Sequence, residues 1–137
     1  MKLFHLFLIV SSSLLLNTSC TAQSNKNSEN VKSKAENNAV EVYYFHFTHR
    51  CATCMAIENV TKEALAEMYG NKVNFTSLNL DESEGELKGK ELQVSGQTLI
   101  IVSENKKINL TNEAFMNARS NPEKLKEVIK ANIDPLL

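Results

Sequence analysis

VEVYYFHFTHRCATC, residues 40–54, is the stretch that decides the fold of this 137-residue chain. Residues 40–47 are rich in Val, Tyr and Phe, which favour a β-strand. Residues 55–69 carry apolar side chains at the spacing of one buried helical stripe: Ile57, Val60, Ala64, Leu65 and Met68. Cys51 and Cys54 therefore stand between a predicted strand and a predicted helix.

Cys51 and Cys54 form a C-x-x-C pair on the first turn of that helix, where two cysteines can close a disulfide. Unpaired N–H groups and the positive end of the helix dipole favour a thiolate on the first sulfur, and the thiolate is the reactive species. The alternative is a structural disulfide. Its loop of about four residues would contribute only about 2 kcal/mol, against about 3 kcal/mol for a loop of about 15 residues. The pattern favours reactive chemistry, metal binding included, over a structural bridge.

The N-terminus predicts an export signal over residues 1–20. Lys2 supplies the positive start, and Leu3 to Leu16 is an apolar run too short for a transmembrane helix. Two processing routes are open. Cys20 could be the lipidated residue of a lipoprotein, which we favour, or cleavage could follow Ala22.

Residues 21–38 are polar and lack aromatics, which predicts a disordered tether with a span of roughly 25 Å. Residues 39–137 then form one domain of about 100 residues, enough for a sheet with helices. Export implies an oxidising compartment, the periplasm, where a free dithiol persists only if something keeps reducing it. The net charge of −1, with no basic stripe and no phosphate loop, gives no reason to expect nucleic acid.

The rest of the sequence predicts the order β-α-β-α-β-β-α, with a short extra helix before the last one. Strands are expected at 72–80, 98–102 and 107–110, and a weak exposed helix at 81–93, which Gly85 and Gly89 disfavour. Gly70 is expected to end the first helix, and Thr111 to cap the short one. The last helix is expected to begin at Asn121-Pro122, with proline in its favoured first position.

This order and the segments RCATC (50–54), LNLD (78–81) and TLII (98–101) resemble thioredoxin-fold proteins. More narrowly, residues 42–46, 49–58 and 115–123 resemble the ArsF-type family of small exported proteins, described as a subunit of a nitrophenyl-compound nitroreductase and associated with arsenic resistance. The resemblance implies an α/β fold, a thioredoxin-like three-layer sandwich with a central mixed sheet. It also implies redox work outside the cytoplasm, with a membrane-embedded thiol-electron carrier as the source of electrons and an acceptor that is a protein or a small molecule. Beyond the dithiol itself it implies no cofactor.

Two positions depart from the thioredoxin pattern. Gln97 stands where thioredoxins have a cis-proline, and a cis bond before a non-proline residue costs about 2.5–4 kcal/mol, so a trans bond is expected. Phe45 stands six residues before Cys51, where thioredoxins bury an acid that helps move protons. Both the substrate-docking edge and the proton relay of the pattern are therefore in question here.

The expected mechanism has Cys51 as the attacking thiolate, supported by His49, Arg50 and the helix terminus, and Cys54 as the resolving thiol. Arg50, as a neighbouring cation, would lower the pKa of the Cys51 thiol. The alternative is a binding module for a thiophilic metal or metalloid such as zinc, copper or arsenic. Two imidazoles and two thiols lie within nine residues and could supply its ligands: His46, His49, Cys51 and Cys54.

Overall fold

The computed structural model describes residues 40–104 and 106–137. Three predictions lie outside the described residues: the export signal at 1–20 with Cys20, the alternative cleavage after Ala22, and the tether at 21–38. The described elements, in chain order, are β1 (Val40–His46), α1 (Ala52–Tyr69), η1 (Gly70–Lys72), β2 (Val73–Asn79), α2 (Ser83–Leu92), β3 (Thr98–Ser103), β4 (Lys106–Asn109), α3 (Thr111–Asn117), α4 (Pro122–Ile133) and η2 (Asp134–Leu136). None of the helices in these two ranges is long and apolar enough to cross a membrane.

The four strands form one mixed sheet in the order β2-β1-β3-β4. β1 pairs in parallel with β2 and antiparallel with β3, and β4 pairs antiparallel with β3. Tyr44 of β1 lies opposite Ser77 of β2 and Leu99 of β3. β1 is therefore an inner strand, and the loop that carries the two cysteines leaves from its end.

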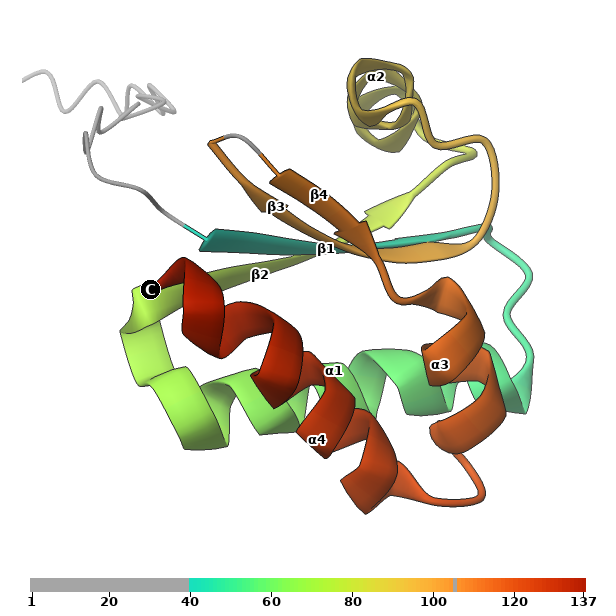
Figure 1. The fold of residues 1–137 in the computed structure, drawn as a ribbon. Coiled ribbons are helices and arrows are strands. Elements are labelled where there is room, and N and C mark those ends of the chain that lie inside the picture. The colour runs from blue at the N-terminus through green and yellow to red at the C-terminus, as the bar shows by residue number, and fades with distance from the viewer. Residues whose placement is uncertain (1–39, 105) are drawn as a thin grey trace, which may run out of the picture. The chain divides into compact units, whose positions relative to one another are not determined.

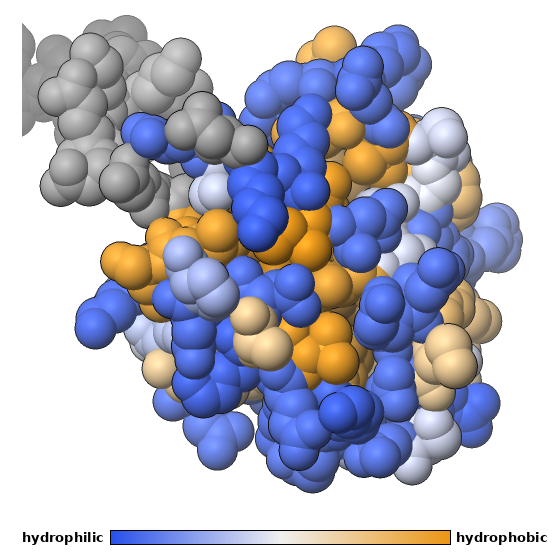
Figure 2. All heavy atoms as spheres, in the orientation of Figure 1, coloured by the Kyte–Doolittle hydropathy of each residue, from blue (hydrophilic) through white to orange (hydrophobic). Residues whose placement is uncertain are grey.

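Helices α1, α3 and α4 cover one face of the sheet, and α2 lies on the other (Figure 1). These three layers, with the mixed sheet between them, make the thioredoxin-like α/β sandwich that the sequence predicted. On the face drawn in Figure 2, hydrophilic residues cover most of the surface and apolar residues show in patches among them.

Alternation along β1 divides the apolar interior into two clusters. Val42 and Tyr44 belong to the cluster under α1, α3 and α4, whereas Tyr43 and Phe45 belong to the cluster under α2. The first cluster includes the predicted stripe of α1 and the buried side chains of α4: Leu125, Ile129 and Ile133. The second contains only five buried residues: Tyr43, Phe45, Leu78, Leu92 and Ile100.

The helix at 81–93 is present as α2, and its glycines explain how it packs. A Cβ on Gly85 would lie 2.0 Å from the carbonyl oxygen of Asn79, and a Cβ on Gly89 would lie 3.0 Å from the Leu80 side chain. The two glycines that disfavour a helix in isolation therefore allow the close approach of α2 to the end of β2. Tertiary contact outweighs the intrinsic propensity here.

The predicted cap at Thr111 was wrong. Leu110 is the N-cap residue of α3, and Thr111 is the first helical residue. The Thr111 hydroxyl accepts a hydrogen bond from the backbone N–H of Leu99 at 3.2 Å and contacts the Asn109 carboxamide at 2.6 Å. The hydroxyl therefore ties α3 to β3 instead of capping its own helix.

The predicted start of the last helix and the predicted end of the first helix are confirmed. Asn121 caps α4, its side chain accepting from the Lys124 N–H, and Pro122 is the first residue of that helix. Gly70 ends α1 with φ +56°, a backbone conformation that favours glycine. No peptide bond in 40–104 or 106–137 is cis, as expected for the bond before Gln97.

Candidate functional site

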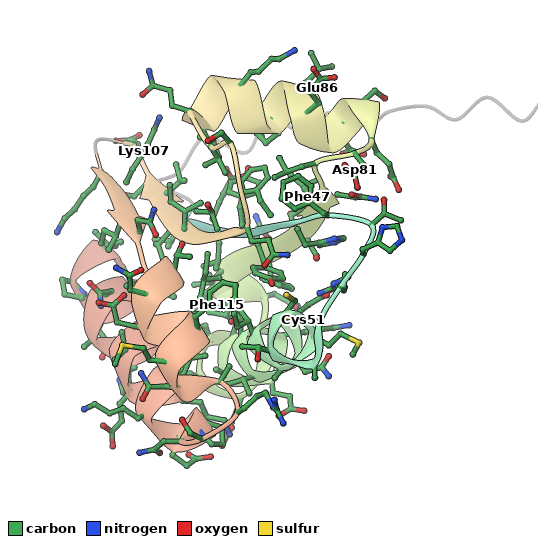
Figure 3. All side chains as sticks on the ribbon, turned by 90° about the vertical axis from the view of Figure 1, so that its right-hand side faces the viewer. Phe47, Cys51, Asp81, Glu86, Lys107 and Phe115 are labelled. Carbon is green, nitrogen blue, oxygen red and sulfur yellow. The ribbon has the colours of Figure 1, made fainter. Side chains whose placement is uncertain are left out.

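Cys51 occupies the N-cap position of α1, which begins at Ala52, three residues earlier than the predicted run. Its backbone is extended, with φ −83° and ψ 166°, and its sulfur accepts a hydrogen bond from the Cys54 N–H at 3.3 Å. Its carbonyl oxygen accepts from the Met55 N–H at 3.1 Å. The Cys51 side chain is exposed, at the start of the helix (Figure 3). The expected placement of the first sulfur beside N–H groups of the helix terminus is confirmed.

The pKa of the Cys51 thiol is lowered from its ordinary value. The largest cause is the hydrogen bond with the Cys54 side chain, and the next is the hydrogen bond from the Cys54 backbone N–H. Both stabilise the thiolate, because a hydrogen bond to the charged form of a group favours that form. Exposure and a lowered pKa together give Cys51 the properties of an attacking sulfur.

Cys54 is the buried member of the pair, with only 1% of its surface exposed. Its sulfur lies 2.6 Å from that of Cys51, and both cysteines are free thiols. On its other side, the Cys54 sulfur lies 3.2 Å from the side-chain carbonyl oxygen of Gln97, which is a second acceptor for its one proton. Gln97, at the position of the thioredoxin cis-proline, thus contacts the dithiol directly.

Arg50 contacts the buried half of the site. Its guanidinium forms an ion pair with Glu58, donates to the Cys54 carbonyl oxygen at 3.4 Å, and lies 5.8 Å from the centre of the Tyr44 ring. Arg50 was expected to lower the pKa of the Cys51 thiol. Among the described residues, none of these contacts is with Cys51. Arg50 instead joins the first turns of α1 to β1.

The loop before Cys51 is tied to the connection between β2 and α2. The Asp81 carboxylate accepts from the Thr48 N–H at 2.7 Å, and the Asn79 amide donates to the Thr48 hydroxyl at 3.0 Å. Figure 3 shows Asp81 and Phe47 on the α2 side of this loop and Cys51 at its end. The pKa of Asp81 is lowered, first by the hydrogen bonds from Thr48 and then by the nearby His49 and His46. The two histidines are therefore near enough to act on the charge of the Asp81 carboxylate.

The ligand set of the metal alternative is not assembled. In residues 40–104 and 106–137, no three His, Cys, Asp or Glu side chains are grouped so that they could hold a metal ion. The His46 ring contacts the carbonyl oxygen of its neighbour Phe47 at 3.0 Å. The four residues of the predicted H-x-x-H-x-C-x-x-C set therefore do not converge, although the two thiols do.

Three contributors to the site were missed from the sequence: Tyr44, Glu58 and Asp81. Phe45 is fully buried under α2, whereas its neighbour Tyr44 belongs to the cluster on the face that α1 covers. Strand alternation places Tyr44 on the face opposite Phe45, which was a usable signal. Glu58 lies one helical turn beyond Cys54, also within reach of local reasoning. Asp81 has no such signal, because its partner Thr48 is 33 residues away.

Comparisons with known proteins find likenesses among solved structures alone. No protein-family model and no curated protein sequence matches it. A solved structure of the germline-specific thioredoxin Deadhead from Drosophila melanogaster is 22% identical, covering 69% of this chain and 82% of that one, with a TM-score of 0.48. Thioredoxin O2 from Arabidopsis thaliana in its oxidised state is 23% identical, covering 69% and 75%, with a TM-score of 0.47. A thioredoxin from Thermus thermophilus is 18% identical, covering 70% and 75%, with a TM-score of 0.44.

The fold is defined by the sheet order and the helix layers described above, and these likenesses assign no activity. The site itself presents an exposed sulfur with a lowered pKa in contact with a buried thiol. Such a pair can exchange with an external disulfide and then close on itself.

Proposed function

We propose that this protein is an exported thiol–disulfide oxidoreductase in which Cys51 attacks and Cys54 resolves. One observation carries the proposal. An exposed sulfur at a helix N-terminus lies 2.6 Å from the sulfur of a buried thiol. A helix N-terminus and hydrogen-bond donors lower the pKa of a cysteine and make it reactive, whereas a buried structural cysteine is inert.

The proposed reaction has two steps. The Cys51 thiolate attacks an acceptor disulfide, forms a mixed disulfide with one sulfur and releases the other as a thiolate. Cys54, after losing its proton, attacks the Cys51 sulfur, which closes the Cys51–Cys54 disulfide and releases the second acceptor thiolate. The pair loses two electrons, the acceptor gains two, and the released thiolates take up protons.

Export and anchoring belong to the same proposal. The N-terminal signal and Cys20 would place the domain in the periplasm on a lipid anchor, with residues 21–38 as its tether. In that compartment the oxidised pair has to be reduced again, and a membrane-embedded thiol-electron carrier is the proposed donor. The final acceptor is a protein or small-molecule disulfide.

The finer resemblance, to the ArsF-type family, supports this electron-transfer role and the periplasmic location. The nitro-compound and arsenic descriptions of that family point to no residue of this chain, so the proposal is confined to thiol exchange. Arsenic or another thiophilic ion is the alternative, with Cys51 and Cys54 as its thiolate ligands. The alternative requires stoichiometric metal in the purified protein that is lost in Cys51→Ser.

Turnover and covalent trapping with two cysteine variants test the proposal. The full chain with Cys20→Ser has only Cys51 and Cys54 as thiols, and in the presence of dithiothreitol it is expected to reduce a disulfide-bonded model protein catalytically. When the reduced protein is freed of dithiothreitol before mixing, adding Cys54→Ser should leave the model protein attached to Cys51 as a mixed disulfide, because no second thiol resolves it. Adding Cys51→Ser should abolish both turnover and attachment. Turnover that survives Cys51→Ser would refute the proposal, and absence of turnover in the parent would leave only a structural or binding role.

A further inference from the structure

The Cys54 sulfur has two polar neighbours that can accept its single proton. They are the Cys51 sulfur at 2.6 Å and the Gln97 side-chain oxygen at 3.2 Å. In the mixed disulfide, Cys51 is bonded to the acceptor sulfur and is no longer a thiolate. Gln97 is then the remaining acceptor of the two. A hydrogen bond that the thiol donates stabilises the protonated form, which cannot attack.

Tyr44, on β1, has a hydroxyl that can donate a hydrogen bond, whereas the Gln97 oxygen accepts one. Its side chain is fully buried, and its hydroxyl makes no hydrogen bond within the described residues. Burial raises the pKa of Tyr44 far above its ordinary value, and the neighbouring Cys54 and Arg50 are the other groups that act on it. The hydroxyl therefore keeps its proton, and it lies near Cys54 without a partner at hydrogen-bond distance. A buried donor in that state is costly unless another state of the protein satisfies it.

The charged groups around Cys54 are the same before and after it loses its proton. Arg50, from the preceding loop, donates to the Cys54 carbonyl oxygen and is paired with Glu58 of α1. The His46 ring lies 6.0 Å from the Tyr44 ring on β1. Gln97, in the segment before β3, is an uncharged amide and Tyr44 stays neutral. Only the hydrogen bonds of Gln97 and Tyr44 have to change when Cys54 passes from thiol to thiolate.

We propose that Gln97 and Tyr44 are positioning residues for the two states of Cys54: Gln97 accepts from its thiol, and Tyr44 donates to its thiolate. The inference rests on the proposed function, because it concerns the resolving step. In that step the Cys54 proton leaves, the Cys54 sulfur bonds to the Cys51 sulfur, and the bond from Cys51 to the acceptor sulfur breaks. The acceptor leaves as a thiolate that takes up a proton. In the mixed disulfide Gln97 restrains this step by holding the Cys54 proton, and Tyr44 promotes it.

A chromogenic aromatic disulfide separates the two steps. Full-length protein carrying Cys20→Ser is reduced, freed of metal with a chelator, and mixed with excess reagent in a stopped-flow instrument. The first coloured thiolate reports attack by Cys51, and the second reports closure by Cys54. The variants are Gln97→Leu, which removes the acceptor, Gln97→Glu, which keeps the shape and strengthens it, and Tyr44→Phe, which removes only the buried hydroxyl.

Changes of opposite sign are expected in the rate of the second release. One hydrogen bond corresponds to a change of roughly 3- to 10-fold, so closure should be faster by that factor in Gln97→Leu and slower in Gln97→Glu and Tyr44→Phe. The first release should change little. Tyr44→Phe should not lower the free energy of unfolding, since its hydroxyl makes no hydrogen bond in the reduced protein.

The outcomes that overturn the inference differ from those that overturn the proposed function. If Gln97→Leu slows closure as Gln97→Glu does, Gln97 only aligns the sulfur. If Tyr44→Phe closes at the parent rate, its hydroxyl does not serve the thiolate. Either result refutes the inference while the second release in the parent still supports the oxidoreductase. A parent protein that releases only one coloured thiolate refutes both.

Discussion

The two faces of the sheet are built differently, and only one of them carries the dithiol. The face under α1, α3 and α4 buries the larger cluster, which extends from β1 to the last helix, and α1 carries the dithiol. The face under α2 buries five residues and relies on close backbone contact at Gly85. The redox pair therefore stands on the more extensively packed layer. Substitutions under α2 should change stability and leave Cys51 reactive, whereas substitutions around the dithiol should do the reverse.

The largest expected effect is the loss of a side chain from the larger cluster. Leu125 is fully buried and Leu92 is 7% exposed, in the smaller cluster. Removing a buried leucine side chain costs roughly 2–5 kcal/mol, so we expect about 4 kcal/mol for Leu125→Ala and about 2 kcal/mol for Leu92→Ala. Urea unfolding followed by circular dichroism measures both. Equal losses would show that the two faces contribute alike.

The next effect concerns the close contact of α2. Gly85→Ala puts a Cβ 2.0 Å from the Asn79 carbonyl oxygen, so the helix has to move away from β2. Overpacking of this kind costs roughly 1–3 kcal/mol, and a backbone atom as the obstacle favours the upper end. The free energy of unfolding should fall, while the alkylation rate of Cys51 stays at the parent value.

Gly96→Ala is the matched control for this substitution. A Cβ on Gly96 would meet nothing within 4 Å, so the stability should change by less than about 0.5 kcal/mol. If Gly85→Ala behaves like Gly96→Ala, α2 is not held by the contact with Asn79. If Gly85→Ala also alters the reactivity of Cys51, the two faces are not independent.

The pH dependence of Cys51 sharpens the comparison on the dithiol face. Its pKa is lowered, first by the hydrogen bond with the Cys54 side chain. Alkylation by iodoacetamide should therefore reach half its maximal rate at a lower pH than for an ordinary thiol. The lowered value also makes the thiolate stabilise the reduced fold above the pKa of the unfolded thiol, a contribution lost as the pH falls through the folded-state value.

Cys54→Ala tests whether the hydrogen bond with the Cys54 side chain is the main cause of the lowered pKa of Cys51. It removes the side-chain hydrogen bond and keeps the backbone N–H that donates to the Cys51 sulfur. The half-maximal pH for alkylation of Cys51 should move up, toward the ordinary thiol value. A shift in the other direction, or none, would mean that the helix terminus alone determines the reactivity of Cys51.

The smallest expected effect concerns the hydrogen bond between Thr48, in the loop before Cys51, and Asp81, in the connection between β2 and α2. Asp81 accepts from the Thr48 N–H at 2.7 Å and is exposed. Because the pKa of Asp81 is lowered, this bond stabilises the fold above the pKa of the unfolded carboxyl and is lost as the pH falls through the lower, folded-state value. Asp81→Asn should speed hydrogen exchange at the Thr48 amide several-fold, as measured by NMR, and leave exchange at Tyr44 unchanged. Unaltered exchange at Thr48 would show that the loop holds its shape without Asp81.

Local rules predicted most of the fold. Strand alternation at Tyr43 and Tyr44, the stripe of α1, the Asn121 cap and the Gly70 terminus all follow from residues close together in sequence. The C-x-x-C pair also predicted that two sulfurs lie together at the start of α1. What local rules do not give is the surroundings of those sulfurs, because the contact between Cys54 and Gln97 spans 43 residues.

The differences between expectation and structure have the same origin. Arg50 was expected beside Cys51 from sequence adjacency, but the turn into α1 directs its guanidinium to Glu58 and the Tyr44 ring. Gly85 was treated as a weakness of α2 because helix propensity contains no information about the neighbouring strand. Thr111 was expected to cap a helix, and the strand partner Leu99 uses its hydroxyl instead. In each case a partner distant in sequence, or the direction of a side chain, decided the outcome.

The reduction potential of the Cys51–Cys54 pair tests the central claim most directly. The full chain with Cys20→Ser would be equilibrated with glutathione buffers, and the fraction of disulfide measured by thiol trapping and mass spectrometry. An electron-donating dithiol with a stabilised thiolate should have a potential between about −200 and −270 mV, the range from glutaredoxins to thioredoxin. A value near about −120 mV would mark a strong oxidant and reverse the proposed electron flow. A pair that stays oxidised below about −300 mV would be a structural disulfide, and the redox account would be wrong.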